Sequence, residues 1–128
     1  YSKKNNVELN IIEKMENSEL NNLYKDYRYF ISTSKYEGNP KTILEAMSNG
    51  CIVFASNIPN HAELINNQKN GFLFDLNTNS LKDSFIANIN NLDSLISISK
   101  SAYFYTEENN SLEKLSNKEY EDYLLLVK

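Results

Sequence analysis

The strongest structural signal in the sequence is the stretch Ser34-Lys35-Tyr36-Glu37-Gly38-Asn39-Pro40-Lys41-Thr42-Ile43-Leu44-Glu45-Ala46-Met47-Ser48-Asn49-Gly50. A polar loop over residues 35–39 leads to Pro40, which is tolerated in the first turn of a helix, with Asn39 as the N-cap. Gly50 is the residue type that commonly ends a helix, so we predict a helix over residues 41–49. Both ends of this helix are marked in the sequence.

Apolar segments on both sides of this helix predict parallel strands. Tyr29 to Ser34 is rich in aromatic and β-branched residues, and Cys51 to Ala55 is a continuous apolar run, typical of a strand covered on both faces. Strand, helix and strand form one βαβ unit, which we expect to be right-handed. A short helix near residues 62–65, a turn at Asn70-Gly71 and a strand over residues 72–74 continue the alternation. The predicted fold class is α/β.

The remaining segments predict an edge strand and further helices. Residues 7–12 alternate apolar and polar side chains, which is a strand pattern, and residues 17–27 have the spacing of an amphipathic helix. From Ser80 onward the apolar spacing predicts three helices. We therefore expect one partial domain, with strands and helices alternating over about residues 1–79 and C-terminal helices over about residues 80–128.

Composition excludes several classes of protein. The chain has 128 residues, of which 41% are hydrophobic and 23% charged, as in a soluble globular domain, and no apolar run approaches the roughly 18 residues of a membrane span. The net charge of −4 disfavours a nucleic-acid partner. Cys51 is the only cysteine, so an intrachain disulfide and a cysteine-based zinc cluster are excluded. Tyr1 stands where a methionine would start a chain, which indicates truncation.

The loop and helix after the first predicted strand suit an anionic ligand. Open α/β sheets bind ligands at the carboxyl ends of their strands, and the amides of a helix N-terminus favour phosphate. Pro40 has no N–H group, so the expected donors are the amides of Lys41 and Thr42. Gly38 removes side-chain bulk, which lets a ligand approach the backbone.

Two carboxylates flank this predicted phosphate site. Glu45 lies one turn into the helix, and its Cβ tilts back toward the helix N-terminus, where its carboxylate would suit a vicinal diol. Glu37 in the loop would accept hydrogen bonds from further hydroxyls. The alternatives without a ligand role are a surface ion pair of Glu45 with Lys41 and a solvated loop carboxylate at Glu37. The combination favours a site for a nucleotide sugar.

A family resemblance rests on these same residues. Glu37 to Glu45 resembles the E-x7-E motif of retaining glycosyltransferases with the GT-B fold, of the family-four type (glycosyl transferases group 1). Glu45 to Gly50 resembles the EAM-x-x-G extension of that motif. Tyr29 to Ser34, Cys51 to Ser56 and Asn70 to Phe74 are similar to the family's strands. The resemblance covers roughly residues 20–74.

The resemblance implies a fold and a function. The chain would be the C-terminal, donor-binding half of a GT-B enzyme, with a partial Rossmann-like parallel sheet and a helical C-terminal segment. It would help transfer a sugar, with retention, from a nucleoside diphosphate sugar to an acceptor hydroxyl in glycan biosynthesis, as a hexosyltransferase. No metal or other cofactor is expected. The implied site residues are Glu37 as the catalytic candidate and, for donor binding, Glu45, Gly38, Asn39, Lys41 and Thr42.

The sequence also departs from the family. Residues 1–28 contain neither the glycine turn nor the Arg/Lys pair that clamps the diphosphate, and residues 7–12 resemble the family's third strand. The N-terminal, acceptor-binding domain is missing, so we expect the isolated chain to be inactive. The implied partners are the nucleotide-sugar donor, an acceptor glycan, lipid or small molecule, and the missing domain. The implied location is the cytoplasm, at the inner membrane face.

The departures from the family leave an alternative function open, and two single residues, His61 and Cys51, are interpreted without a ligand role. The chain would otherwise be a non-catalytic nucleotide-binding or protein-interaction module derived from the same fold. His61 is interpreted as a residue at a helix start rather than a ligand of the donor pocket. Cys51 is interpreted as a small core residue, because no positively charged partner is visible nearby.

Overall fold

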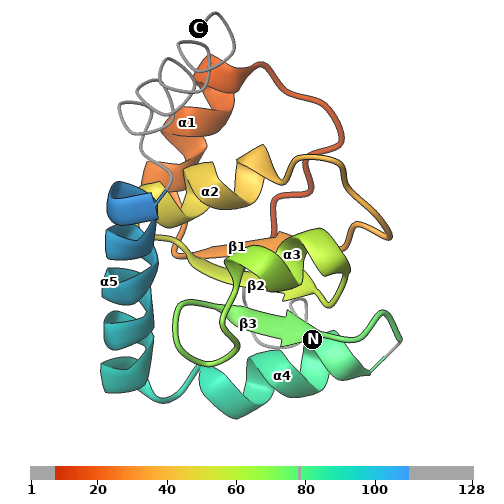
Figure 1. Cartoon of the computed structure of the whole chain (residues 1–128), viewed down its shortest axis with the longest axis vertical. Coiled ribbons are helices and arrows are strands. Elements are labelled where there is room, and N and C mark those ends of the chain that lie inside the picture. Colours follow the sequence, from red (N-terminus) through yellow and green to blue (C-terminus); the bar gives the residue numbers. More distant parts are fainter. Residues whose placement is uncertain (1–7, 78, 110–128) are drawn as a thin grey trace, which may run out of the picture.

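The computed structural model of the chain describes residues 8–77 and 79–109. Three parallel strands form one sheet in the order β1-β2-β3. Helices surround this sheet (Figure 1). The elements are α1 (Asn17–Asp26), β1 (Tyr29–Ser32), α2 (Lys41–Ser48), β2 (Ile52–Ser56), α3 (Pro59–Leu64), β3 (Phe72–Phe74), α4 (Ser80–Asn88) and α5 (Leu92–Asn109).

The predicted strand-helix-strand unit is confirmed. β1 and β2 pair in parallel, with Tyr29 opposite Ile52, and α2 connects them. α2 ends at Ser48, and Gly50 follows with a φ of 80°, a left-handed conformation that glycine adopts without a side-chain penalty. β3 covers the predicted residues 72–74 and pairs with β2. The α/β fold class is therefore confirmed.

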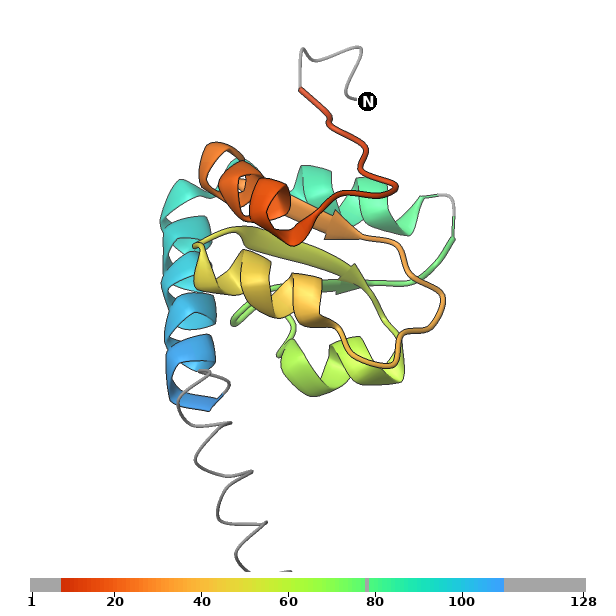
Figure 2. The ribbon, with the colours of Figure 1, turned by 90° about the horizontal axis from the view of Figure 1, so that it is seen from above.

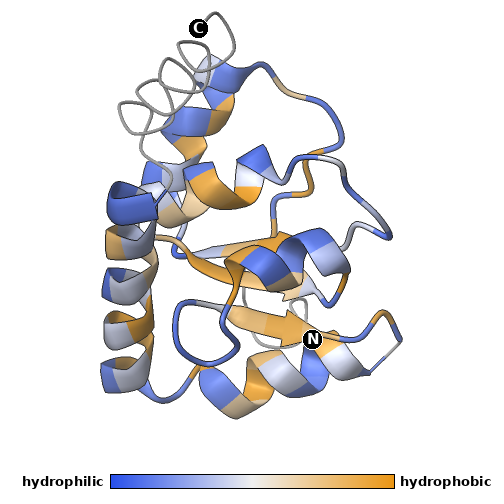
Figure 3. Ribbon diagram, viewed as in Figure 1, coloured by the Kyte–Doolittle hydropathy of each residue, from blue (hydrophilic) through white to orange (hydrophobic). Residues whose placement is uncertain are grey.

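The central strand β2 separates two apolar layers. Val53 and Ala55 belong to a core cluster with buried side chains of α1 and α2. Ile52 and Phe54 point to the opposite face, where Phe54 stacks on Phe72 with ring centroids 4.6 Å apart. This alternation is the period of two that a strand imposes. The hydropathy colouring shows β2 and β3 as the apolar centre of the ribbon (Figure 3).

Helix α5 closes one end of the sheet. It packs mainly against α2 and β2, and the hydroxyl of Ser99 donates to the carbonyl of Gly50 over 2.7 Å. In both ribbon views the arrowheads of the strands point away from α5 (Figures 1 and 2). The carboxyl ends of the strands therefore lie at the other end of the sheet, beside the loop that follows β1.

The prediction of a strand at the N-terminus is wrong for residues 8–12, and Val7 lies outside the described residues. Residues 8–12 have no regular structure, and Leu9 and Ile11 are 57% and 77% exposed. A strand needs a neighbour that accepts its backbone hydrogen bonds, and none of the described strands pairs with this segment. Alternating side chains alone do not supply that partner.

Several helix boundaries also differ from the predictions. Pro40 occupies the N-cap position instead of the first helical residue, and the structure shows no capping hydrogen bond from a side chain at this end. α3 begins at Pro59, earlier than the predicted residue 62, because proline suits the first turn of a helix. α4 and α5 confirm two of the three predicted C-terminal helices, whereas the third, near residues 112–127, lies outside the described residues. In the part of the chain that the structure describes, no helix has the length and hydropathy of a membrane span.

Candidate functional site

The loop after β1 is fastened to the ends of β2 and α3. The hydroxyl of Ser56, the last residue of β2, donates to the carbonyl of Ser34. The side-chain amide of Asn60 donates to the carbonyls of Glu37 and Gly38. Both contacts join segments more than 20 residues apart in the sequence. The backbone that carries Glu37 is therefore held at the carboxyl end of the sheet.

The carboxylate of Glu37 meets a buried histidine. Oε2 of Glu37 lies 3.2 Å from Nε2 of His61, whose side chain is fully buried, while the Glu37 side chain is 25% exposed. The other ring nitrogen, Nδ1, lies 2.8 Å from the carbonyl oxygen of Ser56. The histidine is thus enclosed between a strand end and the predicted sugar-binding carboxylate.

Sequence reasoning missed this role of His61. The sequence predicts a residue at a helix start, and His61 does lie in α3, but its side chain is fully buried. The one signal in the sequence is its place five residues after Ser56, at the same end of the sheet as Glu37. That placement follows only when the strands are known to be parallel.

Glu45 has its own partners on α1 and α2. The hydroxyl of Tyr24 in α1 donates to Oε2 of Glu45 over 3.4 Å, and Nζ of Lys41 lies 3.6 Å from Oε1. Burial, and then the nearby carboxylate, raise the pKa of Tyr24 well above its usual value of 10.0, so the phenol stays a hydrogen-bond donor at neutral pH. The side chain of Glu45 keeps 20% of its surface exposed.

The N-terminus of α2 differs in one detail from the sequence prediction. The amide of Lys41 donates to the carbonyl of Asn39 over 2.8 Å, so it would have to leave this carbonyl to bind an anion. Thr42 follows in the first turn, where the helix itself offers no acceptor to the amide. A Cβ atom built on Gly38 meets no heavy atom within 4 Å, so the backbone there is open to a ligand.

The structure therefore gathers the predicted residues on one loop and one helix, with separate partners for the two carboxylates. Glu37 contacts His61, and Glu45 contacts Tyr24 and Lys41. Within residues 8–77 and 79–109, no group of three or more His, Cys, Asp or Glu side chains has the arrangement of a metal site. Two acceptor groups and a helix N-terminus suit hydroxyl groups and an anion.

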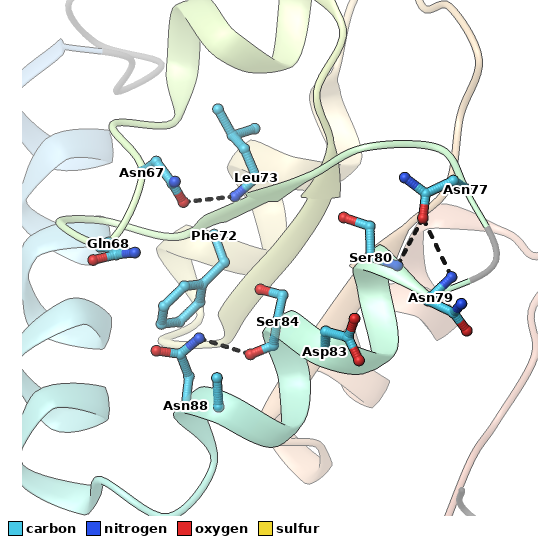
Figure 4. Close-up of a pocket in the computed structure, with 11 residues that line it drawn as sticks. Asn67, Gln68, Phe72, Leu73, Asn77, Asn79, Ser80, Asp83, Ser84 and Asn88 are labelled. Atoms are coloured by element: carbon cyan, nitrogen blue, oxygen red, sulfur yellow. Dashed lines mark hydrogen bonds between the residues drawn. The ribbon is translucent and has the colours of Figure 1, made fainter.

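Two grooves lie elsewhere on the described surface. One, of about 480 Å³, runs between β3, α4 and the turn before β3, and its polar lining includes Asn67, Asn77 and Asn88 (Figure 4). The other, of about 750 Å³, lies between α3 and α5. Neither is lined by Glu37 or Glu45. The candidate site is thus defined by side chains at the strand ends and not by these grooves.

Comparison with known proteins matches this chain to one family. The model of the family described as glycosyl transferases group 1 matches residues 1–103. A curated relative from Escherichia coli, a UDP-Gal:alpha-D-GlcNAc-diphosphoundecaprenol alpha-1,3-galactosyltransferase, is 39% identical over 69 residues, which are 54% of this chain and 17% of that protein.

Solved structures show the same fold. A glycosyltransferase from Rickettsia africae superposes with a TM-score of 0.76 at 31% identity, over 84% of this chain and 29% of that one. Sucrose-phosphate synthase from Thermosynechococcus elongatus, at 16% identity, has a TM-score of 0.81 over 98% of this chain and 32% of its own.

The match also shows which half of the fold is present. The C-terminal domain of a glycosyl transferase group 1 family protein from Francisella tularensis superposes with a TM-score of 0.64 at 21% identity, over 87% of this chain and 59% of that one. The chain spans less than a third of the length of the E. coli, Rickettsia and Thermosynechococcus proteins. With the family model matching most of its length, the chain belongs to the glycosyl transferases group 1, as a C-terminal domain of the GT-B fold.

Proposed function

We propose that the chain binds the nucleoside diphosphate sugar donor of a retaining hexosyltransferase. In the reaction, the bond between the anomeric carbon and the diphosphate breaks, and the diphosphate leaves with the electron pair. A new bond forms to the oxygen of an acceptor hydroxyl, whose proton passes to the leaving diphosphate, and the configuration of the anomeric carbon is kept. Transfer requires an acceptor-binding domain in addition to this chain.

One observation carries the proposal: two partly exposed carboxylates are held by separate partners at the carboxyl end of a parallel sheet. Glu37 is fastened through His61, and Glu45 through Tyr24. An ionised carboxylate accepts hydrogen bonds and donates none, so it suits ligands that are rich in hydroxyl groups. We assign Glu37 to the hydroxyls of the sugar and Glu45 to the ribose.

The helix N-terminus between them is assigned to the diphosphate. The amide of Thr42 and the positive end of the α2 dipole would stabilise the charge that develops on the leaving group. Gly38 and Asn39 would let the diphosphate approach the backbone, and Lys41 would supply a second amide on leaving the carbonyl of Asn39. The proposed chemistry assigns no step to a metal ion.

A donor and a location are also proposed. The name of the E. coli relative contains a UDP-linked hexose and a lipid diphosphate acceptor, so a UDP-hexose is the first donor to test and a lipid-linked glycan the first acceptor. A soluble donor and a lipid acceptor meet at a membrane surface. We therefore place the protein in the cytoplasm, at the inner membrane face.

The test is calorimetric titration of the full-length polypeptide with UDP, GDP and their glucose, galactose, N-acetylglucosamine and mannose conjugates. We expect Glu45→Gln to weaken nucleotide and nucleotide sugar alike, and Glu37→Gln to weaken only the sugar conjugate. Each loss should be roughly 10- to 100-fold, the value of a hydrogen bond to a charged group. Glu19→Gln, an exposed carboxylate on α1, is the matched control.

The outcomes separate the two functional classes. Binding of one nucleotide series with this pattern of losses supports the donor site, and the anomeric configuration of the product, read by NMR, tests retention. A folded protein that binds none of these nucleotides is instead an interaction module.

A further inference from the structure

The buried ring of His61 faces acceptor atoms on both sides. Nδ1 lies 2.8 Å from the carbonyl oxygen of Ser56 and 3.2 Å from the hydroxyl oxygen of the same residue. A carbonyl oxygen only accepts, and the Ser56 hydroxyl already uses its hydrogen to donate to the carbonyl of Ser34. Nδ1 must therefore carry a hydrogen.

The other nitrogen faces a carboxylate. Nε2 lies 3.2 Å from Oε2 of Glu37, whose side chain keeps a quarter of its surface exposed and so stays in contact with solvent. The ring therefore connects two segments: Nδ1 contacts the end of β2, and Nε2 contacts the carboxylate on the loop after β1.

We propose that His61 is a positioning residue, whose Nε2 hydrogen-bonds the carboxylate of Glu37 and whose Nδ1 donates to Ser56. This inference deepens the proposed function, because the role of Glu37 rests on it. Oε2 of Glu37 is occupied by His61, which leaves Oε1 to accept from a hydroxyl of the donor sugar. Asn60, next to His61, holds the backbone carbonyl of the same glutamate, so α3 fixes both ends of Glu37.

Two substitutions at position 61 separate positioning from a merely structural role. In His61→Gln the amide nitrogen stands where Nε2 stood, so the variant keeps a donor for Glu37 and loses the donor for Ser56. In His61→Asn the amide nitrogen stands where Nδ1 stood, so the variant keeps the donor for Ser56 and loses the one for Glu37. Both variants replace the ring by a smaller amide, and asparagine, one methylene shorter than glutamine, loses more packing at this fully buried position, so an unchanged affinity for UDP is the control for packing.

The first experiment measures affinities for UDP and for the UDP-hexose that the full-length polypeptide binds. We expect His61→Asn to weaken the UDP-hexose about 10-fold, the cost of releasing an ordered side chain, with UDP unchanged. His61→Gln should stay within about 3-fold of the wild type for both ligands. Equal losses in the two variants, a larger loss in His61→Gln, or a loss shared by UDP would overturn the proposal. Thermal unfolding of each variant checks that it is folded.

The second experiment reads the contact between the ring and Glu37 without any ligand. In a protein labelled with ¹⁵N-histidine, the His61 signals are those that disappear in His61→Gln. We expect the Nε2 signal of His61 to shift in Glu37→Gln, where an amide replaces the carboxylate that Nε2 contacts, and to stay unchanged in the control Glu19→Gln. An Nε2 signal that is the same in Glu37→Gln and in the wild type would contradict the inference. Because this readout needs no donor, it stands even if the protein binds no nucleotide sugar and the proposed function fails.

Discussion

The hydroxyl of Tyr24 in α1 donates to Oε2 of Glu45 in α2, although the two residues are 21 positions apart. The phenol oxygen of Tyr24 also lies 3.3 Å from the carbonyl oxygen of Thr42, so the phenol reaches the first turn of α2 as well. Tyr24 is only 4% exposed, and its ring packs edge-on against Phe30. A helix that comes before the whole motif in the sequence therefore orients the carboxylate that we assign to the ribose.

We expect Tyr24→Phe to weaken nucleotide binding by roughly 3- to 10-fold, which corresponds to one hydrogen bond. The aromatic ring stays in place, so the packing against Phe30 is kept. Tyr27→Phe is the matched control, because it removes a hydroxyl that donates to Glu8 over 2.8 Å, away from Glu45. Calorimetry with UDP checks the prediction, and equal affinities in the two variants would contradict the link to Glu45.

Gly38→Ala tests whether a ligand approaches the backbone of the loop. The added Cβ meets no heavy atom within 4 Å, and φ at this glycine is not left-handed, so we expect no loss of thermal stability. The methyl group would instead fill the space that we assign to the donor, so donor affinity should fall. An unchanged affinity for the nucleotide sugar would show that the donor stays clear of Gly38.

Gly50→Ala is expected to do the opposite, lowering stability with little direct effect on the donor site. Gly50 has a φ of 80°, and an L-residue in that conformation costs about 1–2 kcal/mol. The new Cβ would be 3.6 Å from Oγ of Ser99, an ordinary contact, so the backbone strain is the main cost. Urea unfolding measures this loss, and a variant as stable as the wild type would refute the argument.

The fold was largely predictable because its signals are local. The βαβ unit follows from the continuous apolar run of β2 and from the proline and glycine at the ends of α2, all within about 30 residues. The strand predicted near residues 7–12 failed for residues 8–12 because strand pairing depends on a distant neighbour. Alternating side chains indicate that a segment could join a sheet, but they do not show that a neighbouring strand is present to pair with it.

The candidate site was predictable only in part, for a related reason. Glu37 and Glu45 were recognised from their spacing within one loop and one helix. The residues that hold them, His61 and Tyr24, are 24 and 21 positions away, and no spacing rule connects such pairs. Their contacts arise when α1 and α3 pack beside α2 and the loop after β1, so the motif locates the carboxylates and the tertiary structure supplies their partners.

The buried thiol of Cys51 makes the unfolding free energy fall at alkaline pH. Its sulfur donates to the carbonyls of Tyr24 and Tyr27, and burial raises its pKa from 9.0 to about 11. Because the folded state favours the neutral thiol, this contribution to stability is complete below pH 9 and is lost as the pH rises toward 11. Two pKa units correspond to about 3 kcal/mol of unfolding free energy in total, of which about 2 kcal/mol is lost between pH 9 and pH 11.

Cys51→Ser should remove most of this pH dependence. The serine hydroxyl still has one hydrogen to donate beside these carbonyls but does not titrate in this range, so any cost of the substitution is a constant offset. Tyr24, whose pKa is also raised, is present in both proteins, and the two main causes of its shift, burial and Glu45, are the same in each. We therefore expect the wild type to lose about 2 kcal/mol more than the variant between pH 9 and pH 11, measured by urea unfolding at each pH. Parallel losses in the two proteins would show that the thiol is accessible to hydroxide without unfolding.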